Sequence, residues 1–185
     1  MKIITFVNLV LFWAIINQVN AQDTSLIKKM AYTVTLKKIM LGTENGVEIE
    51  KSISKKSTLS LTAGMGLVLL KDNDVYNING RIALIPMIST SYRYYYNFLQ
   101  RAKMNKYISD NCASFLIGRF DVFFPNPAEY TNNWMVSQGW GIQRKFAKNV
   151  FYNLQLGITE NFFKVNSNIE FRLQPLINGS IFIKI

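Results

Sequence analysis

The sequence predicts an all-β protein, an antiparallel transmembrane β-barrel of about eight strands preceded by a cleaved signal peptide. Three observations lead to this prediction. The chain starts with an apolar leader, later segments alternate apolar and polar residues with a period of two, and the polar side of that alternation carries few charges. The length of 185 residues, of which 49% are hydrophobic and 17% charged, suits one folded domain rather than a disordered chain.

Residues 1–21 have the features of a secretory signal peptide. Lys2 precedes a mainly apolar run from Ile3 to Ile16, and the stretch Val19-Asn20-Ala21 is a small-residue cleavage site. The apolar run is shorter than the ~20 residues that a transmembrane helix needs, so a helical membrane protein is not expected. We expect cleavage after Ala21, a mature barrel domain at residues 22–185, and a location in the cell outer membrane.

The period-two alternation is clearest in residues 58–70. Apolar residues from Leu59 to Leu69 share one face, and Thr, Ser and Gly residues from Thr58 to Gly66 share the other. Further strands are expected at 31–39, 46–53, 81–96, 114–124, 134–144, 150–161 and within 172–185. The last segment is compatible with one strand or, because of Pro175 and the Asn178-Gly179 turn signal, with a hairpin.

The connections between these strands alternate in length. Segments 54–57 and 146–149 are tight, whereas 71–79, 125–133 and 163–171 are longer and polar, which is the asymmetry of outer-membrane barrels. Segment 97–113 belongs to the short-turn side by this alternation but is long. An even number of strands places both termini on that side, the periplasm.

A soluble exported barrel is the alternative interpretation. In a lipocalin-like protein the face from Leu59 to Leu69 would line the interior and bind a small apolar ligand. The opposite faces, however, consist mostly of Thr, Ser, Asn, Gln and Gly, whereas a soluble surface is about a quarter charged or more. Aromatic residues also cluster near the strand ends, which favours two membrane interfaces: Tyr92, Tyr94, Tyr96, Phe146 and Tyr152 on the short-turn side, and Phe123, Phe124, Trp134, Phe162 and Phe163 on the long-loop side.

The order of these features resembles that of a known group of proteins. Residues 46–56, 60–66, 92–97 and 153–157 are similar to corresponding segments of the small, about eight-stranded outer-membrane β-barrel families of Bacteroidota. The chain departs from them at its end, because it finishes on Ile185 and not on the aromatic residue that the insertion machinery usually reads. The resemblance implies an envelope protein whose partners are outer-membrane lipid and the outer-membrane insertion machinery.

The composition argues against enzymatic function. There is no histidine and a single cysteine, Cys112, so Ser-His-Asp and Cys-His nucleophiles, histidine acid–base chemistry, zinc sites and haem ligation are not expected. Residues 71–74 lack the glycine and glutamate of a calcium loop. We expect no catalytic residue, cofactor or metal. The net charge of +10 favours anionic partners, but no nucleic-acid motif is present and an exported protein is not expected to bind nucleic acid.

Charged residues on the polar faces are predicted to enter the barrel lumen and to neutralise one another. Both signs are represented, which suits a structural plug of ion pairs, with a proton or ion relay as the less favoured alternative. The predicted lumenal network comprises Glu48, Glu50, Arg93, Arg119, Asp121, Glu170 and Arg172.

The long segment 97–113 is predicted to dock another envelope protein from the periplasmic side. It combines apolar and cationic side chains, a mixture that suits a protein interface; the candidates are Phe98, Arg101, Lys103, Lys106 and Tyr107. The sequence thus predicts a non-enzymatic structural or interaction component of the cell envelope, or a small subunit of a larger membrane assembly.

Overall fold

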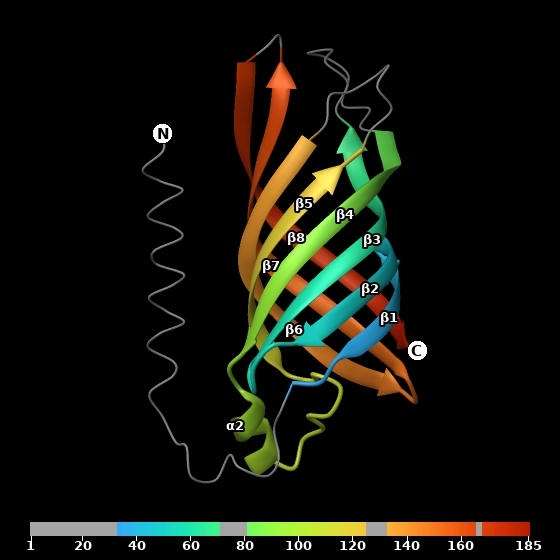
Figure 1. Ribbon diagram of the computed structural model, residues 1–185, viewed down its shortest axis with the longest axis vertical. Helices are drawn as coiled ribbons and strands as arrows, with labels where there is room; N and C mark the ends of the chain where they lie inside the picture. The colour runs from blue at the N-terminus through green and yellow to red at the C-terminus, as the bar shows by residue number, and fades with distance from the viewer. Residues whose placement is uncertain (1–32, 71–80, 125–132, 166–167) are drawn as a thin grey trace.

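The computed structural model describes residues 33–70, 81–124, 133–165 and 168–185, which form a closed barrel of eight antiparallel strands (Figure 1). Each strand pairs with the next in the sequence, and the last pairs with the first. The prediction of an all-β, eight-stranded antiparallel barrel is therefore confirmed. The predicted leader, residues 1–21, lies outside the described residues.

Five of the eight strands have 14 to 17 residues and are longer than typical strands of globular proteins. The strands are β1 (Leu36–Gly42), β2 (Glu44–Ser52), β3 (Ser57–Leu70), β4 (Arg81–Tyr95), β5 (Ser114–Phe123), β6 (Asn133–Ala147), β7 (Val150–Val165) and β8 (Asn168–Lys184). One short helix, α2 (Phe98–Lys103), interrupts the connection between β4 and β5. No helix in the described part of the chain is both long and apolar enough to cross a membrane.

The C-terminal segment is one strand and not a hairpin. Pro175 lies inside β8 opposite Ile158 of β7, whereas β1 pairs with β8 only from Ser180 to Lys184. At Pro175 the strand therefore has one hydrogen-bonded neighbour, and a proline without an N–H is tolerated at such an edge position. The turn signal at Asn178-Gly179 is overridden because both residues pair with β7.

The strands are strongly staggered around the barrel. Following the paired residues from Lys38 through all strands leads to Arg172 of β8, whereas Lys38 itself pairs with Lys184. Closure with such an offset requires steeply tilted strands. Side chains that meet inside the barrel therefore come from distant register positions, which the sequence pattern alone does not reveal.

The described interior is mainly polar and the exterior mainly apolar. Ser60, Thr62 and Glu48 are almost fully buried, whereas Leu59 and Leu61 on the same strand as Ser60 are 48% and 55% exposed. This distribution is the reverse of that in a water-soluble globular protein, whose buried side chains are mostly hydrophobic.

Apolar clusters occupy both ends of the lumen. Tyr95, Phe98, Ala113, Phe115 and Ile117 pack together at the end that holds the β2–β3 and β6–β7 turns, which we call the short-turn end. At the opposite, long-loop end the cluster consists of Ile85, Met87 and Phe123. Phe123 was expected in an outer aromatic belt; it points inward instead because it shares the inward register of Arg119 and Asp121.

Candidate functional site

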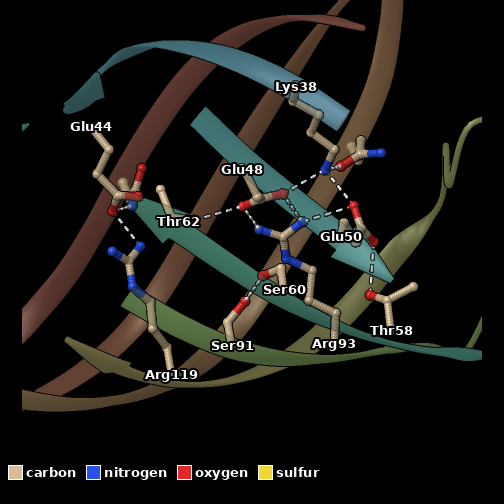
Figure 2. Close-up of polar contacts among 12 residues, drawn as sticks. Lys38, Glu44, Glu48, Glu50, Thr58, Ser60, Thr62, Ser91, Arg93 and Arg119 are labelled. Atoms are coloured by element: carbon tan, nitrogen blue, oxygen red, sulfur yellow. Dashed lines mark hydrogen bonds and ion pairs between the residues drawn. The ribbon is translucent and has the colours of Figure 1, made fainter. Parts of the chain in front are cut away.

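The first candidate site is a cluster of four charged side chains inside the barrel near the short-turn end (Figure 2). Lys38 Nζ donates to Glu48 Oε1 at 2.7 Å and also contacts Glu50. Arg93 donates to both carboxylates, at 2.9 and 2.7 Å to Glu48 and at 3.1 Å to Glu50. Two cations thus neutralise two carboxylates, and all four side chains are at most 3% exposed.

Neutral side chains donate further hydrogen bonds to these carboxylates. Glu50 Oε1 accepts from Thr58 and Tyr95 at 2.7 Å and from Asn111 at 2.9 Å. Every oxygen of Glu48 and Glu50 therefore accepts at least two hydrogen bonds. Buried charges need such compensation because the penalty for desolvating them is large.

A second cluster lies nearer the long-loop end. Arg119 Nε donates to Asp121 at 2.6 Å, and its guanidinium also contacts Glu44, to which Asn178 donates as well. Glu44 and Glu48 are four positions apart on β2, about 13 Å along an extended strand, so the two clusters occupy different levels of the lumen. Figure 2 shows both clusters with Thr62 between them.

The predicted lumenal network is brought together only in part. Glu48, Glu50, Arg93, Arg119 and Asp121 are buried in the two clusters. Arg172 is exposed because β8 at that point extends beyond the part of the barrel closed by β1, and the side chain of Glu170 lies outside the description.

Two charged members of these clusters were not predicted from the sequence, Lys38 and Glu44. Lys38 alternates with the outward Ile39 and Leu41, so the period-two pattern could have identified it. The strand was expected at 31–39, but β1 continues to Gly42, and the alternation of buried and exposed residues is clear only when residues 40–42 are included. Glu44 shares the parity of Glu48 and Glu50 but precedes the predicted start of that strand.

The connection between β4 and β5 covers the short-turn end of the barrel (Figure 1). Its Asn111 is fully buried and bonds to two parts of the barrel at once. The amide pairs with the main chain of Val34, accepting at 2.9 Å and donating at 3.0 Å, and also donates to Glu50. The connection is therefore an integral cap on the lumen.

Asp110, next to this asparagine, anchors the cap to the last strand. Its carboxylate accepts from Lys184 at 2.5 Å and from Tyr107 at 2.6 Å. Burial alone would raise the pKa of Asp110, but the bonds from Lys184 and Tyr107 outweigh it and hold this pKa below its usual value. Burial, with the nearby Asp110 charge, raises the pKa of the Cys112 thiol to about 12, so this buried cysteine is a protonated, unreactive thiol at neutral pH.

The predicted docking residues fall into two groups. Phe98 is 2% exposed and stacks on Tyr95 with ring centroids 5.3 Å apart, so it is not available to a partner. Its apolar side chain faces the barrel because it packs in the apolar cluster with Tyr95 and Phe115 at the short-turn end. Lys103, Lys106 and Tyr107 are exposed.

Arg101, the remaining predicted docking residue, is half-buried. Its Nη2 donates to the main-chain oxygen of Tyr107 at 3.0 Å, which turns the guanidinium back toward the cap. The position of Arg101 therefore differs from that of the two exposed lysines.

The site offers charge neutralisation rather than reactive groups. In the described ranges no group of three or more His, Cys, Asp or Glu residues could hold a metal ion. The carboxylates of both clusters are bound by cationic side chains. No family model, curated protein or solved structure matches the chain.

Proposed function

We propose that the protein is a non-enzymatic, integral outer-membrane β-barrel that serves as a structural or interaction component of the cell envelope. The observation that carries this proposal is the apolar outer surface. Strands all around the barrel contribute exposed aliphatic or aromatic side chains to it: Ile39, Leu41, Val47, Ile49, Leu59, Leu61, Leu84, Ile88, Phe120, Trp140, Leu154, Leu156, Leu173, Ile177, Ile181 and Ile183. A continuous apolar surface of this kind suits contact with lipid and not with water.

Aromatic side chains near the long-loop end support the same proposal. Phe120, Trp134, Phe162 and Phe171 form a row of ring contacts from β5 to β8, with successive centroids 6.1, 3.9 and 6.5 Å apart. Aromatic girdles at the interfaces are typical of outer-membrane barrels.

The short-turn end has outward aromatic residues as well. Trp140 Nε1 donates to the Tyr96 hydroxyl at 2.6 Å, and Phe146, beside the β6–β7 turn, is 80% exposed. Rings with one polar atom suit a membrane–water interface because their apolar body and polar tip meet different environments.

The alternative function, a soluble lipocalin-like carrier, requires the apolar residues of β3 to contact a ligand inside the barrel. Leu59, Leu61 and Leu67 are each 45% or more exposed on the outer face. The interior instead holds the two charge clusters, which are poor partners for an apolar ligand. These observations favour the membrane protein.

The proposal is tested by the behaviour of the protein in membranes. The protein, expressed with its leader in a bacterium with an outer membrane, is expected to remain in the membrane pellet after alkaline carbonate extraction. It should also migrate differently on SDS gels before and after boiling, because a closed barrel resists SDS until heated. Release by carbonate together with identical migration would contradict integral insertion and favour the soluble carrier.

The exposed part of the cap is the surface on which we propose that an envelope partner docks. Lys103, Lys106 and Tyr107 extend from it, and Lys145 lies over the Tyr107 ring with its Nζ 4.6 Å from the centroid. Tight turns present little surface, so this segment is the main element on this side that a protein partner could contact.

A further inference from the structure

Two arginines from different elements approach each other on the outer side of the short-turn end. Arg144 in β6 has the parity of Trp140 and Ile142, which face outward. Arg101 lies in α2 of the cap. Ser114 connects the two positions, because its hydroxyl accepts from Arg144 and its N–H donates to Asn97 Oδ1 at 2.8 Å. The main-chain oxygen of Asn97 in turn accepts from Arg101 N at 3.1 Å, so the two arginines lie in the same region of the short-turn end.

Hydrogen bonds fix both arginines in this arrangement. Arg144 donates from Nη2 to Ser114 Oγ at 3.1 Å and from Nη1 to the main-chain oxygen of Gln143 at 2.8 Å. Arg101 Nη2 donates to the main-chain oxygen of Tyr107 at 3.0 Å. Each guanidinium group is therefore held in a fixed position by its own hydrogen bonds.

No carboxylate compensates this pair within the described residues. Neither arginine takes part in an ion pair there, and Asp110, the carboxylate of the same connection, is bound by Lys184 and Tyr107. Arg101 Nε is buried and has no hydrogen-bond partner in the described part of the chain. Two adjacent guanidinium groups with an unused donor are suited to an anion that accepts several hydrogen bonds, such as a phosphate group.

The surroundings indicate where such an anion would come from. Arg144 pairs across the strands with Tyr152, and it follows Trp140 by four residues on the same face of β6. Trp140 Nε1 donates to the Tyr96 hydroxyl at 2.6 Å. The pair of arginines thus adjoins the outward aromatic side chains that suit the boundary between lipid tails and headgroups. Further exposed cations nearby in sequence, Lys145 and Lys148, add attraction for an anionic surface.

We infer that Arg101 and Arg144 form a binding site for the phosphate group of an anionic phospholipid in the periplasm-facing leaflet. This inference rests on the proposed membrane insertion and deepens it by naming the lipid class. The guanidinium groups bind the phosphodiester oxygens, and the neighbouring aromatic side chains contact the glycerol backbone and the upper acyl chains. A lipid is favoured over an acidic protein because Arg144 lies on the outward face of β6, with Trp140 and Ile142, at the edge of the cap.

The test uses the full mature protein folded in an uncharged detergent and titrated with short-chain phosphatidylglycerol, short-chain phosphatidylcholine, inorganic phosphate or an oligoglutamate peptide. Binding is measured as the rise in thermal unfolding midpoint with ligand concentration. The variants are Arg101→Gln, Arg144→Gln and Arg144→Lys, and Lys148→Gln is the matched control because it removes an exposed cation of the same end. The difference between unheated and boiled samples on SDS gels is recorded for each variant.

Phosphatidylglycerol is expected to bind the original protein and Lys148→Gln with similar affinity, and each Arg→Gln variant about tenfold more weakly. Arg144→Lys should bind with intermediate affinity because lysine keeps the charge but loses the forked geometry. Unchanged affinity in Arg101→Gln, which lies outside the strands and leaves the barrel intact, would overturn the inference.

Two other outcomes would also overturn it. Inorganic phosphate binding as tightly as phosphatidylglycerol would indicate a site for the free anion, and tighter binding of oligoglutamate would indicate a protein partner. If the unsubstituted protein shows no heat-dependent gel shift, membrane insertion itself is contradicted. Failure of the lipid-site inference can therefore be distinguished from failure of the proposed membrane insertion.

Discussion

Lys38 shows how one buried side chain can determine the state of the lumen. Its ammonium group contacts Glu48, Glu50 and, at 3.3 Å, Gln143, and it lies 4.6 Å from the centroid of the Phe182 ring. Without it, Arg93 alone would face two buried carboxylates. A buried carboxylate without a cationic partner is costly, whereas a complete set of ion pairs contributes little net stability.

We predict that Lys38→Met lowers the free energy of unfolding by about 3–5 kcal/mol. The measurement is urea unfolding of the detergent-folded protein. Lys37→Met is the matched control, because Lys37 is the adjacent, exposed lysine of the same strand and its replacement should change stability by less than about 0.5 kcal/mol. Equal effects of the two substitutions would show that the ion pairs of Lys38 are not needed.

Asp110 predicts a pH-dependent contribution of the cap to stability. Because its pKa is lower in the folded protein than the ordinary value of 3.8, its contribution is complete above that value and is lost as the pH falls through the folded-state pKa. The difference in unfolding free energy between the original protein and Asp110→Asn should be constant at neutral pH and shrink below about pH 4. A difference that persists unchanged in acid would contradict a role for the Asp110 charge, and Lys184→Gln should flatten the same pH profile.

At the scale of elements, the cap is the feature that distinguishes this barrel from one with simple turns. Its polypeptide uses left-handed backbone conformations at Asn105, Asp110 and Asn111, residue types that tolerate positive φ. Asn111 thereby inserts its amide between the main chain at Val34 and the lumenal Glu50. The cap and the charge cluster are therefore one hydrogen-bonded unit.

Asn111→Ala is expected to destabilise the protein by about 2–3 kcal/mol. It leaves the part-buried main-chain N–H and C=O of Val34 without their partner and removes one of the three hydrogen bonds to Glu50 Oε1. Hydrogen exchange at the Val34 amide should accelerate at the same time. Asn105→Ala is the matched control: Asn105 has φ 54°, close to the 58° of Asn111, but is exposed. If both substitutions have the same effect, backbone preference and not the amide hydrogen bonds would explain the loss.

The exposed face of the cap leads to a prediction about partners. Lys103→Gln combined with Lys106→Gln should weaken co-purification of a periplasmic partner, because it removes the exposed positive charge, and should leave the heat-dependent gel shift unchanged. Lys55→Gln with Lys56→Gln in the β2–β3 turn serves as the control for total charge. Unchanged co-purification with the first pair, or crosslinks confined to the long-loop end, would contradict docking at the cap.

At the scale of the whole molecule, the lumen is blocked at several levels. The cap and the apolar cluster around Phe115 close one end, the two charge clusters fill the middle, and Ile85, Met87 and Phe123 pack together toward the other end. An eight-stranded barrel has room inside for little more than its own side chains. The described interior therefore provides no wide aqueous path.

Reconstituted into planar bilayers, the protein is expected to show no steady conductance. A known open porin in the same bilayers provides the positive control, and the heat-dependent gel shift verifies that the reconstituted sample is folded. Stable openings on the nanosiemens scale would show that the clusters do not block the lumen.

The period-two alternation was sufficient to predict the number of strands and the direction of most side chains, because each strand has one lipid- or solvent-facing side and one lumenal side. It also identified Glu48, Glu50, Arg93, Arg119 and Asp121 as lumenal. Local signals were weaker where pairing competes with them. The turn signal at Asn178-Gly179 yielded to pairing with β7, which extends along the whole of β8.

Only the tertiary structure decided which of these side chains meet. The stagger of the strands brings Lys38 to Glu50 and Arg119 to Glu44, and the folding of the cap buries Phe98. The period-two alternation predicts on which face of a strand a residue lies, because the face depends only on the position of the residue among its neighbours in the sequence. Contacts across the lumen depend instead on the tilt and register of the closed barrel, which are set by all its strands together.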